Sequence, residues 1–208
     1  LSDDKDQLKT IIDIGEKQVK AIEHFFKKLK KPNPVADYKW EYNLIDNKMA
    51  NAFCFPGGKR EKLDESLADT ALRETEEELG LKPTRVLGTL SSIPLFTSDY
   101  RIKPYVCQVG TKTLVPNPAE VEKSLWFSID QILEQSVIQG FPVRVGGGEK
   151  ISPVFEICGQ VMFGATAYAL LELLQVICRE IGKEIPPIRA TGYVWDWTLL
   201  RPVKNASD

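Results

Sequence analysis

Apolar positions along the chain follow helical spacing in some segments and strand spacing in others. Residues 5–31 carry an apolar residue every three to four positions, which predicts an amphipathic helix that Pro32 ends. Further helices are expected at the segments 130–134 and 166–180. Runs rich in β-branched and aromatic residues predict strands over residues 39–45, 49–55, 85–93, 101–109 and 124–127. This alternation predicts an α/β or α+β fold.

Two later segments do not continue this alternation. Gly146, Gly147 and Gly148 predict a flexible loop. In the tail from Pro186, Tyr193, Trp195 and Trp197 alternate with smaller or polar residues, which predicts an edge strand with its aromatic side chains on one face. A hydrophobic clamp for a partner is the alternative interpretation of these aromatics.

The densest charge lies on the predicted helix that ends near Gly80. Glu74, Glu77 and Glu78 stand at positions i, i+3 and i+4, so their carboxylates share one helical face, and Glu76 adds a further charge. This is the helix end that disfavours anions. A bound divalent cation compensates for such a cluster, because carboxylate oxygens suit Mg²⁺ and Mn²⁺. A solvated acidic face is the alternative.

Residues around this cluster favour a metal site over a solvated acidic face. A Phe-Pro-Gly-Gly turn precedes the helix, and either Asp64 or Ser66 is a suitable cap for its start. Arg73 lies next to the acidic residues and could pair with one carboxylate to hold it in place.

Composition narrows the function classes. The chain has 208 residues, a one-domain length, with 43% hydrophobic residues and a net charge of −2, which argues against a general nucleic-acid-binding surface. Its apolar stretches are shorter than a membrane span requires.

The four cysteines are scattered, as is usual in a reducing compartment. The lone His24 is expected on a helix surface rather than at a zinc site.

The acidic helix resembles the box of the Nudix hydrolases. That box runs Gly, five residues, Glu, seven residues, Arg-Glu, an aliphatic, any residue, Glu-Glu, any residue, Gly and an aliphatic. Residues 73–81, RETEEELGL, match its second half with Thr75 at the aliphatic position. The first half of the box is one residue longer here. Five residues separate Gly58 from Asp64, as in the box, but eight rather than seven then separate Asp64 from Arg73. If Glu65 is taken as the acidic residue, the seven-residue gap is restored and the first gap becomes six.

This one-residue expansion after FPGGK is similar to the coenzyme A diphosphatase subgroup. The segments IKPYV at 102–106, NPAEV at 117–121 and GATA at 164–167 also match segments of that subgroup, and they occur in the same order. The resemblance covers about residues 53–178. It implies an α/β/α sandwich in residues 37–208, with the box helix over residues 64–80.

The resemblance also implies a site and a reaction. The reaction is metal-dependent hydrolysis of a pyrophosphate bond in coenzyme A or a related nucleoside diphosphate conjugate, a small-molecule substrate. Mg²⁺ or Mn²⁺ would be held by carboxylates, the substrate by the glycine turn and two cations, and Arg73 would be structural. The residues implied are Glu74, Glu77 and Glu78 for metal, Glu77 and Glu120 for catalysis, and Gly57, Gly58, Lys59 and Arg60 for substrate. Surface roles for Lys59, Arg60 and Glu120 stay open.

The first part of the chain departs from that subgroup. Residues 40–59 resemble the hairpin ahead of the zinc helix in HExxH zinc metallopeptidases, although the chain lacks the HExxH residues themselves. The two families share the Pro-Gly-Gly-Lys turn, so we predict a composite chain, natural or engineered, with residues 1–36 as a helix and linker.

Three interpretations follow for the whole chain. They are a metal-dependent diphosphatase, a catalytically weak binding or scaffold module, and an engineered chimera without physiological activity. The expected location is intracellular and reducing, in the cytoplasm, the peroxisome or the mitochondrial matrix. No nucleic-acid or membrane partner is expected, and a homodimer is left open.

Overall fold

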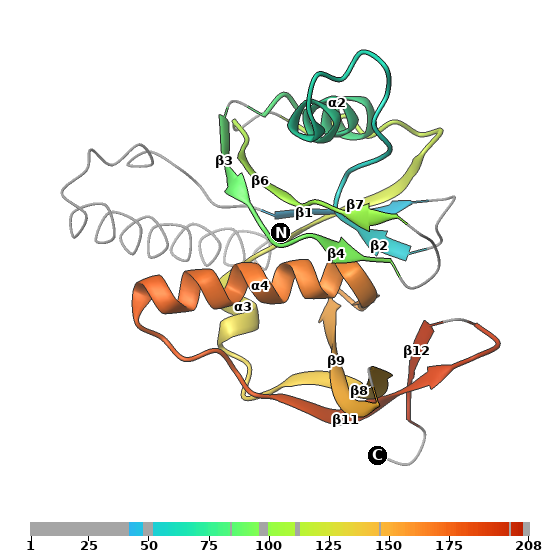
Figure 1. Cartoon of the computed structure of the whole chain (residues 1–208), viewed down its shortest axis with the longest axis vertical. Helices are drawn as coiled ribbons and strands as arrows, with labels where there is room; N and C mark the ends of the chain where they lie inside the picture. Colours follow the sequence, from blue (N-terminus) through green and yellow to red (C-terminus); the bar gives the residue numbers. More distant parts are fainter. Residues whose placement is uncertain are drawn as a thin grey trace, which may run out of the picture.

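Helices and strands alternate through the part of the chain that the structure describes (Figure 1). This computed structural model describes residues 42–47, 52–83, 85–95, 100–110, 113–145, 147–199 and 201–205. The predicted helix over residues 5–31, His24 and the predicted unit 1–36 lie outside the described residues. The mixed α and β content confirms the predicted fold class.

The N-terminal hairpin joins a three-stranded antiparallel sheet. Strand β1 (Tyr42–Asn47) pairs with β2 (Ala52–Cys54) on one side and with β7 (Val121–Phe127) on the other. The expected hairpin therefore forms over the described residues 42–47 and 52–54, and its strands are part of the same sheet as β7.

Two shorter antiparallel pairs continue this half of the molecule. Strand β3 (Arg85–Thr89) pairs with β6 (Tyr105–Gln108), and β4 (Ile93–Pro94) pairs with β5 (Arg101–Ile102). The strands predicted over 85–93 and 101–109 are thus each divided in two. Proline explains the second division, because Pro104 has no N–H to donate between β5 and β6.

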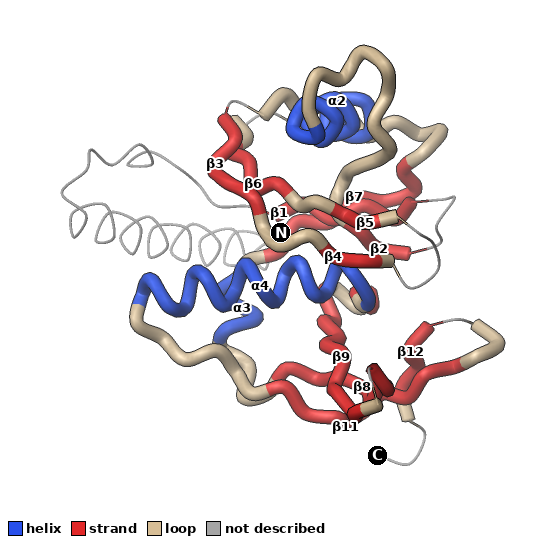
Figure 2. Tube along the Cα trace, viewed as in Figure 1, coloured by secondary structure: helices blue, strands red, loops and turns tan. Residues whose placement is uncertain are grey.

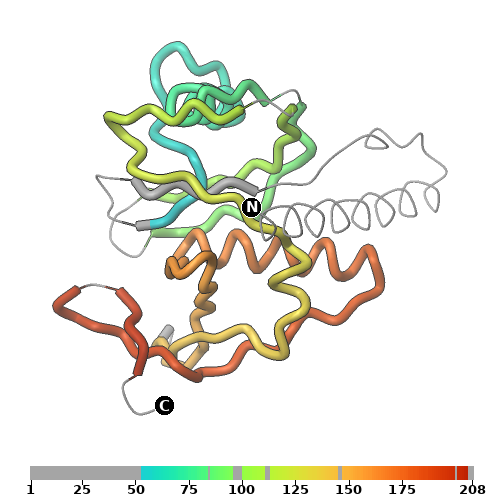
Figure 3. The backbone as a smooth tube through the Cα atoms, turned by 180° about the vertical axis from the view of Figure 1, so that it is seen from behind, coloured from blue at the N-terminus to red at the C-terminus, as the bar shows by residue number. Residues whose placement is uncertain are grey.

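Helices cover both sides of these strands. Helix α2 (Leu67–Leu79) lies on one side and α4 (Gly164–Ile181) on the other, the α/β/α arrangement that was expected (Figures 1 and 3). The short helix α3 (Ile129–Leu133) follows β7 directly.

A second sheet, which the sequence did not predict as a unit, lies on the far side of α4 (Figure 2). Its strand order is β10-β9-β8-β11-β12, with β8 and β11 parallel and the other neighbours antiparallel. The strands are β8 (Ile138–Val145), β9 (Gly148–Ile157), β10 (Gln160–Met162), β11 (Ile188–Asp196) and β12 (Arg201–Lys204).

Two sequence expectations change in this sheet. Of the predicted flexible loop at 146–148, Gly147 lies between the paired strands β8 and β9 at φ 81°, and Gly148 is the first residue of β9, while Gly146 lies outside the described residues. The aromatic tail does form a strand, but β11 lies between β8 and β12, so the edge is β12. Tyr193 is buried, whereas Trp197, in the turn after β11, is 81% exposed.

The main hydrophobic core lies along α4, between the two sheets. Phe53 and Phe127 reach it from the first sheet, and Ile138 and Phe155 from the second. Its buried α4 residues are Ala167, Leu170, Leu171 and Leu174. Among the described helices, none is long and apolar enough to cross a membrane.

Replacing Leu170 by Ala should destabilise the whole fold, because this side chain is fully buried on α4. We expect the free energy of unfolding to fall by about 2–5 kcal/mol, since the change leaves a cavity between two sheets. Chemical denaturation measures this difference. The matched control is Val176→Ala on the same helix, where Val176 is 37% exposed and the expected loss is below about 1 kcal/mol. Equal losses in both variants would contradict the placement of the core.

Candidate active site

Helix α2 has a specific cap at each end. The Ser66 hydroxyl accepts a hydrogen bond from the Asp69 N–H at 3.2 Å, and the Asp69 carboxylate accepts one from the Ser66 N–H at 2.7 Å. Gly80 ends the helix at φ 64° and donates to the Glu76 carbonyl at 2.8 Å. Of the two predicted caps, Ser66 is therefore the cap, and the helix begins after Asp64 rather than at it.

Asp64 is a buried carboxylate in the loop before α2. Its Oδ1 accepts from Arg73 Nε at 3.1 Å, and its Oδ2 accepts from the Thr70 hydroxyl at 2.9 Å and the Glu61 N–H at 2.8 Å. These bonds, the one from Arg73 first, hold the pKa of Asp64 well below its usual range. Glu65, the alternative by sequence spacing, is exposed, so Asp64 is the carboxylate that pairs with Arg73.

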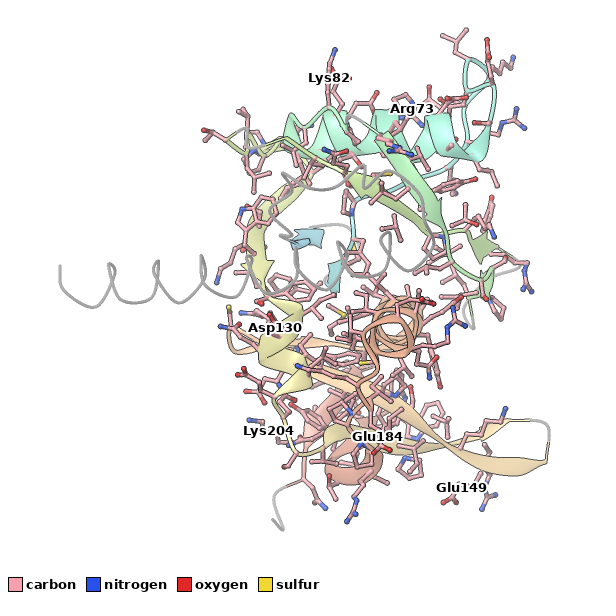
Figure 4. The ribbon with its side chains drawn as sticks, turned by 90° about the vertical axis from the view of Figure 1, so that its left-hand side faces the viewer. Arg73, Lys82, Asp130, Glu149, Glu184 and Lys204 are labelled. Carbon is pink, nitrogen blue, oxygen red and sulfur yellow. The ribbon has the colours of Figure 1, made fainter. Side chains whose placement is uncertain are left out.

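Arg73 joins this loop to the acidic face of α2 (Figure 4). Its Nη1 donates to Glu77 Oε2 at 2.7 Å, and its Nη2 lies 2.9 Å from Glu74 Oε1 and 3.1 Å from the Lys59 carbonyl oxygen. The sequence predicted a pair with one carboxylate, whereas Arg73 pairs with three. In the same view the labelled Glu149 and Lys204 of the second sheet lie far from Arg73.

The glycine turn packs directly against the metal-ligand candidates. The Gly57 N–H donates to Glu78 Oε2 at 3.0 Å. A side chain at position 58 would overlap the Glu74 carboxylate. Glycine at this position therefore allows the turn and helix α2 to approach each other.

Glu78 is the most buried member of the acidic face, with 2% of its surface exposed. Burial first, and then the charges of Glu74, Glu120 and Glu77, raise the pKa of Glu78 to about 7, while the Gly57 N–H opposes the shift. Glu120 is distant from α2 in the sequence, but its loop reaches the end of α2, where the Asn117 N–H donates to the Glu78 carbonyl at 2.8 Å.

The two cations proposed for substrate binding differ in their contacts. Arg60 donates through Nε and Nη2 to the Asp64 carbonyl at 3.1 and 2.9 Å, and through Nη2 to the Glu65 carbonyl at 2.9 Å. Its guanidinium is therefore engaged with the loop backbone. The Lys59 ammonium lies 4.8 Å from the centre of the Tyr100 ring, a cation–π contact that no sequence signal indicated.

No metal-ligating group is assembled among the residues described: no three His, Cys, Asp or Glu side chains are gathered to hold an ion. Glu74 and Glu77 instead pair with Arg73. The donor set nevertheless fits Mg²⁺ or Mn²⁺, because it consists of carboxylate oxygens whose mutual repulsion a cation would relieve. The burial of the Glu78 carboxylate beside the glycine turn supports this fit, because a buried negative charge gains from a neighbouring cation.

The NUDIX domain family matches residues 30–142, more than half of the chain. The chain therefore belongs to the Nudix family. The match begins ahead of the hairpin and includes it, while the likeness of residues 40–59 to zinc metallopeptidases stays a prediction.

Several curated relatives carry the family name. A peroxisomal coenzyme A diphosphatase, NUDT7 of Mus musculus, is 33% identical over 105 residues, covering 50% of this chain and 44% of the relative. A mitochondrial coenzyme A diphosphatase, NUDT8 of the same species, is 36% identical over 121 residues, covering 54% and 56%. An uncharacterized Nudix hydrolase NudL of Photorhabdus laumondii is 31% identical over 132 residues, covering 62% and 70%. The chain spans about half the length of the two mouse relatives.

Replacing Asp64 by Asn should loosen the junction between the loop and α2. The amide keeps the shape of the side chain, but it removes the charge that pairs with Arg73. We expect the melting temperature to fall by several degrees, and calorimetry measures it. Glu65→Gln is the matched control, since Glu65 is exposed, and it should leave the melting temperature unchanged. The opposite ranking would mean that Glu65 is the partner that matters.

Glu78 should make the metal-free protein less stable as pH rises. Its folded pKa of about 7 lies above the ordinary value of 4.5, so the folded state binds this proton more tightly. The stabilisation is complete below pH 4.5 and is lost as pH rises through 7. Between about pH 5.5 and pH 8 we expect a loss on the order of 2 kcal/mol. Denaturation in the presence of a chelator measures it. Glu78→Gln should remove this part of the pH dependence; an unchanged slope would contradict the assignment.

Proposed function

We propose that this chain hydrolyses a pyrophosphate bond in coenzyme A or a related nucleoside diphosphate conjugate, in a metal-dependent reaction. With coenzyme A the products are 4′-phosphopantetheine and 3′,5′-ADP. The observation that carries the proposal is the contact of the acidic face with the glycine turn: the Gly57 N–H donates to the buried Glu78, and the Glu74 carboxylate lies against Gly58. The coenzyme A diphosphatase names of two relatives support the substrate class.

The acidic face of α2 is the proposed metal site. Glu74, Glu77 and Glu78 would hold Mg²⁺ or Mn²⁺, which neutralises phosphate charge and lowers the pKa of a bound water. Glu78 is the most buried of the three and is held by the Gly57 N–H. Glu74 and Glu77 share Arg73 as a partner, and this pairing keeps two like-charged side chains close to each other before metal binds.

The remaining roles follow from exposure and charge. Glu77 and Glu120 are exposed, so either carboxylate is accessible to the attacking water and could accept its proton. The Lys59 ammonium, also at the surface beside the glycine turn, would pair with a phosphate oxygen. Gly57 has open space next to its Cα, which leaves room for a phosphate near the backbone. Arg60 would act on substrate only by leaving the loop carbonyls.

A binding or scaffold module is the second candidate. The ion pairs of Arg73 with Glu74 and Glu77 favour it, because they satisfy these carboxylates without a metal ion. A chimera without physiological activity would behave in the same way in an assay.

For location, we propose a reducing compartment. Cys107, Cys158 and Cys178 are free thiols, as such a compartment allows. The names of the two mouse relatives refer to the peroxisome and the mitochondrion. A homodimer stays a prediction.

Incubation of the chain with coenzyme A, ADP-ribose and NADH in Mg²⁺ or Mn²⁺ tests the proposal. Chromatography should show 3′,5′-ADP formed from coenzyme A. Replacing Glu77 by Gln should lower kcat by about 100-fold or more, since it removes a ligand or a base from the site. Glu76→Gln is the matched control: Glu76 pairs with Lys82 outside the cluster, so its kcat should stay within about twofold of the wild type.

Absence of product above the metal-free blank would favour the module. The absence of product supports this conclusion only if the protein is shown to be folded and calorimetry shows that it binds Mn²⁺. Product formation that Glu77→Gln leaves unchanged would place the chemistry outside the acidic face of α2.

A further inference from the structure

The loop after β6 docks onto the C-terminal end of α2. The Val115 N–H donates to the Leu79 carbonyl at 2.9 Å, and the Asn117 N–H donates to the Glu78 carbonyl at 2.8 Å. These bonds satisfy carbonyl groups that a helix end leaves without partners inside the helix. The loop is therefore held against the same turn of α2 that carries Glu78.

Asn117 is the residue on which this loop turns, and every polar group of Asn117 is used. Its carbonyl accepts from the Glu120 N–H at 3.1 Å and from the Val121 N–H at 2.8 Å. Its Oδ1 accepts from the Ala119 N–H at 3.1 Å, and its Nδ2 donates to Glu120 Oε1 at 3.4 Å. The side chain thus closes the turn and also holds the carboxylate that the turn carries.

These contacts connect two residues that are distant in the sequence. The Asn117 N–H donates to the backbone carbonyl of Glu78, and the Asn117 amide donates to the carboxylate of Glu120. The Glu120 side chain is exposed, so without this bond it would sample several rotamers at the surface. The bond from the Asn117 amide restricts that freedom.

We infer that Asn117 is a positioning residue that holds the Glu120 carboxylate at the acidic face of α2. The inference rests on the hydrolysis proposed above, in which Glu120 accepts a proton or helps to hold the metal. The backbone bonds of Asn117 are sufficient to hold the loop on the end of α2. The Nδ2 bond is the one bond of Asn117 among those described here that reaches the Glu120 carboxylate.

Serine at position 117 separates these two roles. A Ser hydroxyl can accept from the Ala119 N–H and so keep the turn, but it is too short to reach Glu120. Aspartate also keeps the acceptor for Ala119, but it places a second negative charge beside Glu120. The turn should survive both changes, whereas the position of Glu120 should not.

The test is a double-mutant cycle of Asn117→Ser, Glu120→Gln and the variant with both changes. Asn117→Ser should lower kcat for coenzyme A by about 10- to 100-fold through misplacement of Glu120, with KM within about twofold. The double variant should be no slower than Glu120→Gln alone, because Asn117 acts through Glu120. Asn117→Asp should be at least as slow as Asn117→Ser. Asn205→Ser, at the end of β12, is the matched control and should keep full activity.

Two readouts are independent of turnover. The melting temperature of Asn117→Ser should stay close to that of the wild type, since the turn is kept. Titration calorimetry with Mn²⁺ alone should show weaker affinity in Asn117→Ser and Glu120→Gln, with no further weakening in the double variant.

Additive losses in the cycle, or a large fall in melting temperature for Asn117→Ser, would show a merely structural role and overturn the inference. The inference would also fail if Glu120→Gln kept both the wild-type kcat and the wild-type Mn²⁺ affinity. In that case the proposed function would still stand, provided that Glu77→Gln had lost activity. If the wild-type chain hydrolysed nothing, the proposed function would fail, and the Mn²⁺ cycle would decide the inference by itself.

Discussion

The ion pair between Arg73 and the buried Asp64 is the interaction on which the site depends. Asp64 lies in the loop, whereas Arg73 lies on α2, and the same guanidinium also contacts Glu74, Glu77 and the Lys59 carbonyl. One rigid, planar cation therefore sets the distance between the glycine turn and the acidic face. Its removal would leave a buried carboxylate without its main partner and two like charges without a neutralising group between them.

Negative charge near the C-terminal end of a helix is unfavourable, and the surrounding contacts compensate for it unequally. Glu77 and Glu74 have Arg73, and Glu76 has Lys82. Glu78, the most buried of them, has the Gly57 N–H as its partner rather than a cation, and its pKa rises to about 7. The negative charge is thus least compensated at Glu78, a carboxylate bonded to the glycine turn. A divalent cation bound there would gain the most from this arrangement.

Local signals predicted much of this molecule, and long-range contacts account for the rest. The box helix, its end at Gly80 and the two strands before it follow from the spacing of residues, with Ser66 as one of two candidate caps, although Asp46 and Asn47 extend β1 rather than form its turn. The second sheet could not be predicted as a unit, because its parallel pairing of β8 with β11 joins segments separated by α4. Tyr100 and Asn117 were also missed, since their contacts with Lys59 and Glu120 depend on tertiary placement or on turn geometry. Asp64 gave a signal, the displaced carboxylate of the box, but only its burial decided between Asp64 and Glu65.

Stability of the fold and order of the site come from different interactions. The main core lies along α4 and joins two sheets through side chains such as Leu170 and Phe155. Helix α2 packs on a separate, smaller cluster of Leu79, Leu81 and Val121. With so little apolar contact, α2 and the loops around it are placed largely by hydrogen bonds and ion pairs, those of Asp64, Arg73 and Asn117 above all. Such bonds change when a charge is added nearby, whereas apolar packing does not respond to charge in this way. The acidic face can therefore rearrange around a bound cation while the core along α4 stays as it is.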